Sequence, residues 1–221
     1  ANPRADYLVP DGRAVPRMQR HGEAPILADG QGRWPLLLFS HGLSGSPLGD
    51  GYLDFVVLLA SYSYIVAATY HGDRRFADVR FEEFGDVIGV ILGFDKFIAM
   101  QAVRPLGLVA SLDLLLAHSH WRDAVDAERI GGFGASLGGE AMLLLGGAGL
   151  TTSIGQSSKR VLIEPRLKAA VGYVPYFGQA VLPAFGRDQR GVDGVSLPFL
   201  AIGGTADVVA PLAELEAAMV R

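Results

Sequence analysis

Residues 131–140 read GGFGASLGGE, and they place Ser136 inside the pattern Gly-x-Ser-x-Gly. A serine at this spacing is typical of a nucleophile held in a tight turn between a strand and a helix. The pattern alone is weak support, because the chain contains 29 glycines and such spacings also arise by chance. The context therefore decides. A buried strand should precede the serine, a helix should follow it, and catalytic partners should come in the right chain order.

The sequence around Ser136 alternates between strand and helix patterns. Short apolar runs bounded by turn residues predict buried strands over 35–40, 64–69, 129–135, 168–174 and 198–203. Apolar residues spaced three and four apart predict helices over 52–61, 104–119, 136–147 and 211–221. This order predicts an α/β fold with a mostly parallel central sheet and helices on both faces.

Three segments depart from this alternation. Residues 1–34 are polar and rich in proline and glycine, which favours an antiparallel hairpin at an edge of the sheet. Residues 73–103 form an insertion that is apolar nearly all round over FGDVIGVILGFDKFIAM. Such a segment is either a buried core helix or a cap whose apolar face lines an acyl pocket. Residues 147–160 are polar and glycine-rich, which favours a loop beside the site.

The composition narrows the class of protein. With 221 residues and 50% hydrophobic content, we expect one domain over 1–221. The net charge of -4, without a stripe of lysine or arginine, argues against a nucleic-acid partner. The apolar window 87–94 is shorter than the roughly 20 residues of a membrane-spanning helix. We therefore expect a protein without a membrane span.

Cofactors and location are less strongly constrained. The chain has no cysteine, which excludes disulfides and thiolate metal sites, and no pattern in it predicts a metal or an organic cofactor. The sequence leaves the oligomeric state open. It also leaves the compartment open, because a mature secreted chain would likewise lack a signal peptide. A secreted or periplasmic location is favoured over the cytoplasm.

Ser136 has the context that a nucleophile needs, since a predicted strand ends at Ala135 and a helix begins at once. The alternative is a structural glycine turn without chemistry. A second stretch, FSHGLSGSP (39–47), follows the first strong strand, where such enzymes build part of the oxyanion hole. We expect the backbone N–H groups of Leu43 and Leu137 to be the oxyanion donors.

Two histidines and a tyrosine belong near this site. His41 lies in the predicted oxyanion loop and precedes the nucleophile, so we expect it to tie the loop to the backbone. Tyr70 and His71, in TYHGD, follow the strand 64–69 at the same edge of the sheet. They are candidates for lining the pocket.

The stretches 35–75, 126–140 and 198–211 together resemble the α/β-hydrolase superfamily. Within it they are most similar to dienelactone-hydrolase-like, platelet-activating-factor-acetylhydrolase-like and cutinase-like esterases. The likeness spans about residues 35–215, and it departs from these families at Ala135, where they usually have histidine. Cutinase-like enzymes carry the triad acid after the seventh strand, where GGTADVVAP offers Asp207. The alternative role for Asp207 is to cap the next helix.

The general base is the difficulty. The resemblance implies the order serine, acid, histidine, so the base should follow Asp207. The histidines of this chain all precede Ser136: His21, His41, His71, His118 and His120. We therefore expect a further strand, a loop with the catalytic histidine and a last helix beyond Arg221.

These features predict a carboxylesterase that cleaves neutral, apolar esters through a Ser-His-Asp triad and an acyl-enzyme. The resemblance to cutinase-like enzymes implies small-molecule or polymeric substrates, with short to medium acyl groups or aliphatic polyesters. Two alternatives stay open. One is a dienelactone-type or C–C bond hydrolase on the same architecture, and the other is a non-catalytic binding protein with a hydrolase fold.

Overall fold

A computed structural model gives the structure of the chain and describes residues 7–8, 14–15, 32–43, 45–73, 93–179 and 182–220. The chain divides into two compact units, Ala1–Arg33 and Trp34–Arg221. In the first unit, β1 (Tyr7–Leu8) and β2 (Ala14–Val15) pair antiparallel. The predicted hairpin is confirmed. Its predicted place at an edge of the central sheet is not, because within the described ranges these strands pair only with each other.

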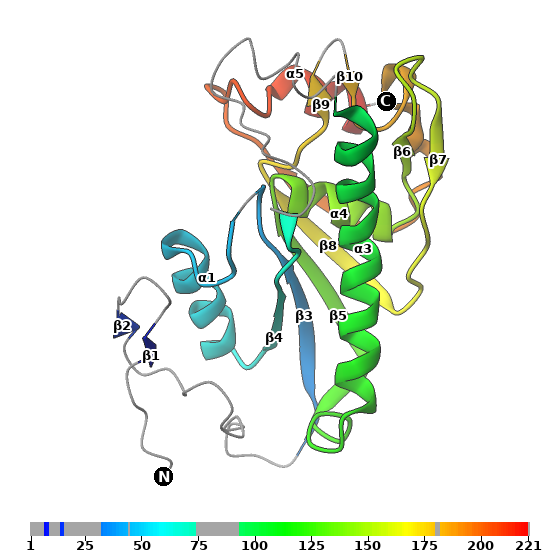
Figure 1. The fold of residues 1–221 in the computed structure, drawn as a ribbon. Helices are drawn as coiled ribbons and strands as arrows, with labels where there is room; N and C mark the ends of the chain where they lie inside the picture. The colour runs from blue at the N-terminus through cyan, green and yellow to red at the C-terminus, as the bar shows by residue number, and fades with distance from the viewer. Residues whose placement is uncertain are drawn as a thin grey trace. The chain divides into compact units, whose positions relative to one another are not determined.

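The second unit contains a parallel sheet of five strands in the order β11-β8-β5-β3-β4 (Figure 1). The strands are β3 (Trp34–Ser40), β4 (Ile65–Thr69), β5 (Val125–Ala135), β8 (Leu167–Tyr173) and β11 (Phe199–Ile202). Every neighbouring pair runs parallel. These are the predicted strands within a few residues, so the predicted fold class is confirmed. The central strand, β5, is the one that leads into Ser136.

Helices cover both faces of this sheet, as the alternation of side chains along β5 shows. Gly132 faces α4 (Leu137–Leu145), because a Cβ at this glycine would overlap Sδ of Met142. The next residue, Phe133, faces the other way and stacks on Phe55 of α1 (Asp50–Ser61), with ring centroids 4.2 Å apart. Close packing of α4 on the sheet therefore depends on a glycine in the central strand.

The helix predicted over 104–119 is longer than expected. It is α3 (Phe94–Ala117), and Pro105 lies inside it rather than in its first turn. Its buried residues continue at helical spacing across the proline: Phe94, Phe97, Met100, Gln101, Arg104, Pro105, Leu108 and Leu112. This packing outweighs the loss of one backbone hydrogen bond at Pro105. Residues 93–103 of the expected insertion thus belong to a core helix, and residues 74–92 lie outside the described residues.

By length and composition α3 would also qualify as a membrane span, a test that the core helix of a soluble protein passes equally well. Its Phe97 and Met100 belong to one buried cluster, and its Leu108 and Leu112 belong to another with Leu36 of β3. The packing of α3 is that of a core helix.

The remaining elements lie beyond α4. They are β6 (Gly149–Thr151), β7 (Ser158–Arg160), β9 (Gly178–Gln179), β10 (Leu182–Pro183), the 3-10 helix η2 (Arg187–Gly194) and α5 (Leu212–Met219). The loop expected over 147–160 is in fact a hairpin, because β6 and β7 pair antiparallel. β6 is buried although its sequence is short and contains glycine, so its hydrophobic pattern was too brief to read.

Candidate active site

Ser136 lies in the turn between β5 and α4 with a backbone conformation of φ 53° and ψ -119°. A positive φ is unfavourable for any residue with a side chain, so the surrounding structure must hold it. The Ser136 N–H donates to the carbonyl oxygen of Tyr173 at 3.0 Å, and its carbonyl accepts from the N–H groups of Gly139 and Tyr176 at 2.9 and 3.0 Å. The strained turn is therefore fixed from both sides.

Glycines make this turn sterically feasible. A Cβ at Gly138 would overlap the carbonyl oxygen of Ser40, and one at Gly134 would overlap the backbone of Gly138. The first turn of α4 thus lies directly against the ends of β3 and β5. The spacing of glycines around Ser136 follows from this close approach of three backbone segments.

The loop after β3 lies beside Ser136. A Cβ built on Gly42 would be 3.4 Å from Cβ of Ser136. The backbone N–H groups of Leu43 and Leu137 donate no hydrogen bond within the described part of the chain. For Leu137 this follows from its place at the first position of a helix, where the N–H has no partner in the preceding turn. Two N–H groups on segments adjoining Ser136 are thus unoccupied.

His41 is buried in this loop, with 2% of its surface exposed. Its Nδ1 donates to the carbonyl oxygen of Gly42 at 2.7 Å, which leaves Nε2 without a proton in the neutral ring. Burial lowers the pKa of His41, so the imidazole stays neutral. Its bond to Gly42 closes the loop on itself.

His71 follows β4 and lies beside the end of β3. Its Nε2 and Oγ of Ser40 are 2.8 Å apart, and its ring is 4.8 Å from that of His41 between centroids. Burial, with the charge of Arg104 and the neighbouring His41, lowers the pKa of His71 to about 2. Such a group is a very weak base. The adjacent Tyr70 is 62% exposed.

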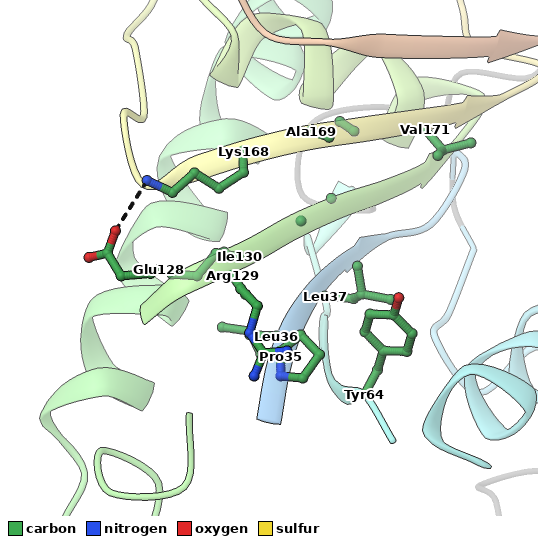
Figure 2. Close-up of a pocket in the computed structure, with 13 residues that line it drawn as sticks. Pro35, Leu36, Leu37, Tyr64, Glu128, Arg129, Ile130, Lys168, Ala169 and Val171 are labelled. Carbon is green, nitrogen blue, oxygen red and sulfur yellow. Dashed lines mark ion pairs between the residues drawn. The ribbon is translucent and has the colours of Figure 1, made fainter. Parts of the chain in front are cut away.

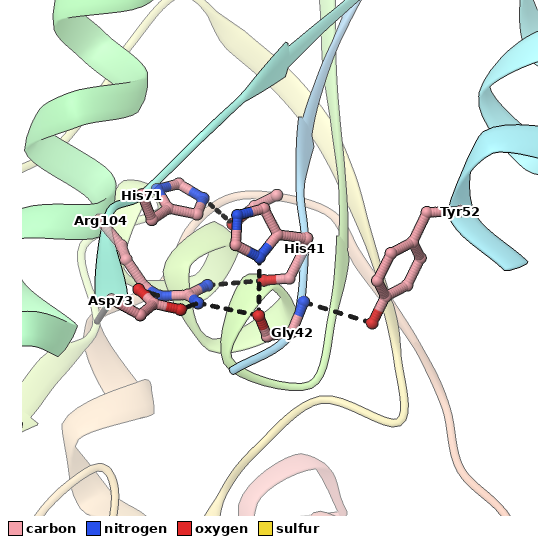
Figure 3. A network of polar contacts seen from close by, with 7 residues as sticks. His41, Gly42, Tyr52, His71, Asp73 and Arg104 are labelled. Atoms are coloured by element: carbon pink, nitrogen blue, oxygen red, sulfur yellow. Dashed lines mark hydrogen bonds and ion pairs between the residues drawn. The ribbon is translucent and has the colours of Figure 1, made fainter. Parts of the chain in front are cut away.

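A buried ion pair underlies the loop (Figure 3). Arg104 of α3 is 1% exposed and forms a salt bridge with Asp73. Its Nη1 donates to the carbonyl oxygen of His41 at 2.6 Å, and its Nη2 donates to that of Gly42 at 3.0 Å. The guanidinium therefore joins α3, the segment after β4 and the loop after β3.

A second buried carboxyl group lies in the first turn of α4. Glu140 is 1% exposed, and its Oε1 accepts from Nε2 of Gln101 at 2.5 Å. Burial raises the pKa of Glu140 to about 8, against the opposing effects of Arg104 and the Gln101 hydrogen bond. Glu140 is thus protonated at neutral pH. Oε1 of Gln101 has no partner among the described residues.

Asp207 lies in the turn after β11 and is half-buried. Its Oδ1 accepts from the N–H groups of Val209 and Ala210, both at 2.8 Å. Its Oδ2 forms no hydrogen bond within the described ranges. One oxygen thus supports the turn ahead of α5, and the other is open to a further donor.

No histidine that the structure describes is bonded to Oγ of Ser136. His118 and His120 follow the end of α3, ahead of the start of β5 and so away from the carboxyl end of the sheet. His21 lies outside the described residues. The structure therefore shows no histidine in contact with Oγ of Ser136 among the described residues, and the base of the expected triad stays a prediction.

Comparisons with known proteins agree with this geometry. The family model of platelet-activating factor acetylhydrolase, isoform II, matches residues 18–84, a part of the chain that includes β3, its following loop, α1 and β4. No curated protein matches the chain. The crystal structure of dienelactone hydrolase from Anabaena variabilis ATCC 29413 is 19% identical, with a TM-score of 0.52 over 86% of this chain and 70% of that chain. The fold is that of an α/β-hydrolase.

A second crystal structure gives the same result for the fold. It comes from Klebsiella pneumoniae subsp. pneumoniae MGH 78578, is assigned as a dienelactone hydrolase, and is 17% identical. Its TM-score is 0.55 over 86% of this chain and 69% of that chain. The suspected likeness to α/β-hydrolase esterases is confirmed, over residues 18–84 by the family model and at the level of the fold by the two solved structures.

The buried polar and charged residues beneath the loop after β3 were missed by sequence reasoning. Arg104 and Gln101 continue the apolar stripe of α3, and Glu140 lies in an otherwise apolar helix. A charged residue on a buried face needs a partner, so its position in the stripe was a usable signal. Asp73 carries no such signal, because it follows β4 in a turn.

The structure also has a cavity of about 390 Å³ on the face of the sheet (Figure 2). Its lining comes from the earlier parts of three neighbouring strands and includes Leu37, Gly131 and Ala169. None of the predicted site residues lines it. Cavity volume and the sequence motifs therefore point to different parts of the sheet.

Proposed function

We propose that this α/β-hydrolase is a carboxylesterase with Ser136 as its nucleophile. One observation carries the proposal: Ser136 is held at a strained φ of 53° beside two unoccupied backbone N–H groups, those of Leu43 and Leu137. Strain of this kind persists only where the surrounding structure enforces it, and it is concentrated at functional sites.

The proposed reaction proceeds in two steps. Oγ of Ser136 attacks the ester carbonyl carbon while a base removes its proton, and the carbonyl oxygen becomes an oxyanion. The N–H groups of Leu43 and Leu137 stabilise that oxyanion by about 3 to 4 kcal/mol per donor. The alcohol leaves with a proton, and water then cleaves the acyl-enzyme by the same route.

Asp207 is proposed as the acid that orients the base. Its position after β11 supports this role, because ligands and catalytic groups gather at the carboxyl ends of strands in such sheets. Its Oδ2 is open to an imidazole N–H, while Oδ1 keeps the turn in place. The base itself stays a prediction, because no described histidine is bonded to Oγ of Ser136. His71 is unsuited to that role because its pKa is about 2.

Neutral, apolar esters are the proposed substrates. Arg104 is the cation bound to the loop, and its four hydrogen bonds go to Asp73 and to two backbone carbonyls. It is therefore not offered to an anionic substrate. From the resemblance to cutinase-like enzymes, we include esters with short to medium acyl groups and aliphatic polyesters among the proposed substrates.

Hydrolysis of p-nitrophenyl butyrate tests the proposal. The wild-type protein should release p-nitrophenol, and Ser136→Ala should lower kcat by up to about 10⁶-fold, the scale seen when a catalytic serine is removed. Ser157→Ala is a matched control, because Ser157 is an exposed serine on the β6-β7 hairpin. Equal activity of wild type and Ser136→Ala would refute the proposal. Turnover of a dienelactone but not of simple esters would favour the alternative hydrolase.

A further inference from the structure

Arg104 binds two consecutive carbonyl groups of the loop that follows β3. We propose that Arg104, held by Asp73, is a positioning residue that orients the Leu43 N–H as an oxyanion donor. This inference rests on the proposed function, since it assigns a role within the same site. It adds to the proposed site a buried ion pair whose two residues are more than 30 positions apart in sequence.

The planarity of the peptide bond connects the carbonyl to the N–H. The carbonyl of Gly42 and the N–H of Leu43 belong to one trans peptide, in which the two groups point in opposite directions. The Gly42 carbonyl points at Nη2 of Arg104. The Leu43 N–H must therefore point away from Arg104. A side chain that contacts no substrate thus fixes the direction of a catalytic donor.

The preceding peptide has the same geometry, and it shows which residues lie on the side of the loop opposite Arg104. The carbonyl of His41 accepts from Nη1 of Arg104, and the N–H of Gly42 in the same peptide donates to Oη of Tyr52 at 3.3 Å. A Cβ on Gly42 would meet both that Oη, at 2.9 Å, and Cβ of Ser136, at 3.4 Å. The side of the loop away from Arg104 is therefore the side of Ser136.

The chemistry of the pair suits a fixed support. Guanidinium groups stay charged and present several donors in a rigid plane, so they can hold two carbonyls in one geometry. Asp73 binds Nε and Nη2 and fixes the plane of the guanidinium (Figure 3). It also compensates the buried charge, which would otherwise be costly. A lysine at this position would offer a single point charge without that fork.

Two other hydrogen bonds to the same carbonyl show what Arg104 adds. The Gly42 oxygen also accepts from Nδ1 of His41 at 2.7 Å and from the N–H of Gly45 at 3.2 Å. Both donors belong to the loop itself, so they can move with it. Among these three donors, only Arg104 lies outside the loop. It belongs to α3, so it can fix the position of the loop relative to that helix.

Kinetics of Arg104→Lys and Arg104→Gln with paired substrates test this role in the full-length protein. The pair is p-nitrophenyl butyrate and its thionoester, in which sulfur replaces the carbonyl oxygen. Sulfur accepts hydrogen bonds weakly, so it benefits little from oriented N–H donors. Asp73→Asn provides a second, milder variant. Arg166→Gln is the control, since Arg166 also binds carboxylates, Glu164 and Asp113, but lies before β8.

We expect kcat for the ester to fall by about 10² to 10³ in the Arg104 variants, the scale of losing one oxyanion donor. The thionoester rate should change far less, so the ratio of the two rates should collapse, while KM stays within a few-fold. Asp73→Asn should change the ratio in the same direction, and Arg166→Gln should leave it unchanged. Rates are compared at a temperature at which circular dichroism shows each variant to be folded.

The outcomes separate this inference from the proposed function. Folded Arg104 or Asp73 variants that keep the wild-type rate ratio would overturn the positioning role and leave the esterase intact. An equal fall in both rates would also overturn it, because a general structural defect acts on both substrates. If the Arg104 variants do not fold, the ratio for Asp73→Asn decides. A wild-type protein without ester hydrolysis would overturn the proposed function, and this inference with it.

Discussion

The ion pairs at the two ends of the five-stranded sheet differ in burial. At the carboxyl end, the side chains of Arg104 and Asp73 are 1% and 2% exposed, and the guanidinium binds backbone carbonyls. At the amino end, Lys168 and Glu128 form an ion pair at 3.6 Å with side chains that are 50% and 86% exposed (Figure 2). The cavity of about 390 Å³ lies beside the exposed pair, and the strained serine lies beside the loop that the buried pair holds.

The contrast shows which feature identifies a site in this molecule. An exposed ion pair contributes about 0 to 1 kcal/mol and constrains little. A buried pair is costly to desolvate, so it is kept only where other bonds compensate for it. Here those bonds run to the loop beside Ser136. Burial and bonding of charge, rather than cavity volume, therefore agree with the proposed active site at Ser136.

After Ser136→Ala, the largest effect at the carboxyl end is expected from Asp207→Asn. The amide oxygen can still accept from the N–H groups of Val209 and Ala210, so the turn should persist. We expect kcat for ester hydrolysis to fall by up to about 10⁴-fold, the scale of losing the acid's control of the histidine tautomer. Steady-state kinetics and circular dichroism measure this. Near-wild-type activity would place the triad acid elsewhere.

An intermediate effect is expected from Glu140→Gln, on stability rather than on rate. The folded protein keeps the Glu140 proton up to about pH 8, whereas the unfolded chain loses it near pH 4.5. The stabilising contribution is therefore fully present below pH 4.5 and is lost as the pH rises through 8. Glutamine retains the acceptor for Gln101 and does not titrate.

Urea unfolding between pH 5 and 8 should reveal this difference. Relative to Glu140→Gln, the wild-type protein should lose unfolding free energy by up to about 1.4 kcal/mol per pH unit. If both proteins lose stability in parallel, Glu140 is not protonated in the folded state, and the contrast between the two ends weakens.

The smallest effect is expected at the amino end, from Lys168→Ala. Its ion pair with Glu128 is exposed, so the free energy of unfolding should change by less than about 0.5 kcal/mol. Ester hydrolysis should be unchanged, although Lys168 lines the cavity of about 390 Å³. A fall in kcat of tenfold or more would indicate that the cavity takes part in the reaction. It would contradict the contrast drawn between the two ends of the sheet.

Much of the fold could be predicted because its signals are local. Each strand of the sheet is a short apolar run, and each was found within a few residues, with β5 ending before Ser136 as expected. The helix α3 was misplaced because Pro105 resembles a helix start, while burial of Phe94 and Phe97 extends the helix backwards. Tertiary packing overrode a local signal there.

The site could be predicted only in part, for the same reason. Ser136 and the loop after β3 follow from their places at strand ends, which a sequence reveals. The contacts of Arg104 with Asp73 and with the loop join segments far apart in the chain, and no local pattern specifies them. The roles of Asp207, Tyr70 and the base stay predictions, because they depend on groups whose contacts with Ser136 are not established.

Reaction of the full-length protein with a fluorophosphonate, followed by peptide mass mapping, tests the central claim most directly. Phosphonylation needs a nucleophilic serine. The tetrahedral phosphorus of the adduct places one of its oxygens where the oxyanion of an ester would form. The account predicts a single adduct, on Ser136, that is absent from Ser136→Ala. An adduct on Ser44 or Ser157 with Ser136 unmodified, or no adduct in the folded protein, would contradict it.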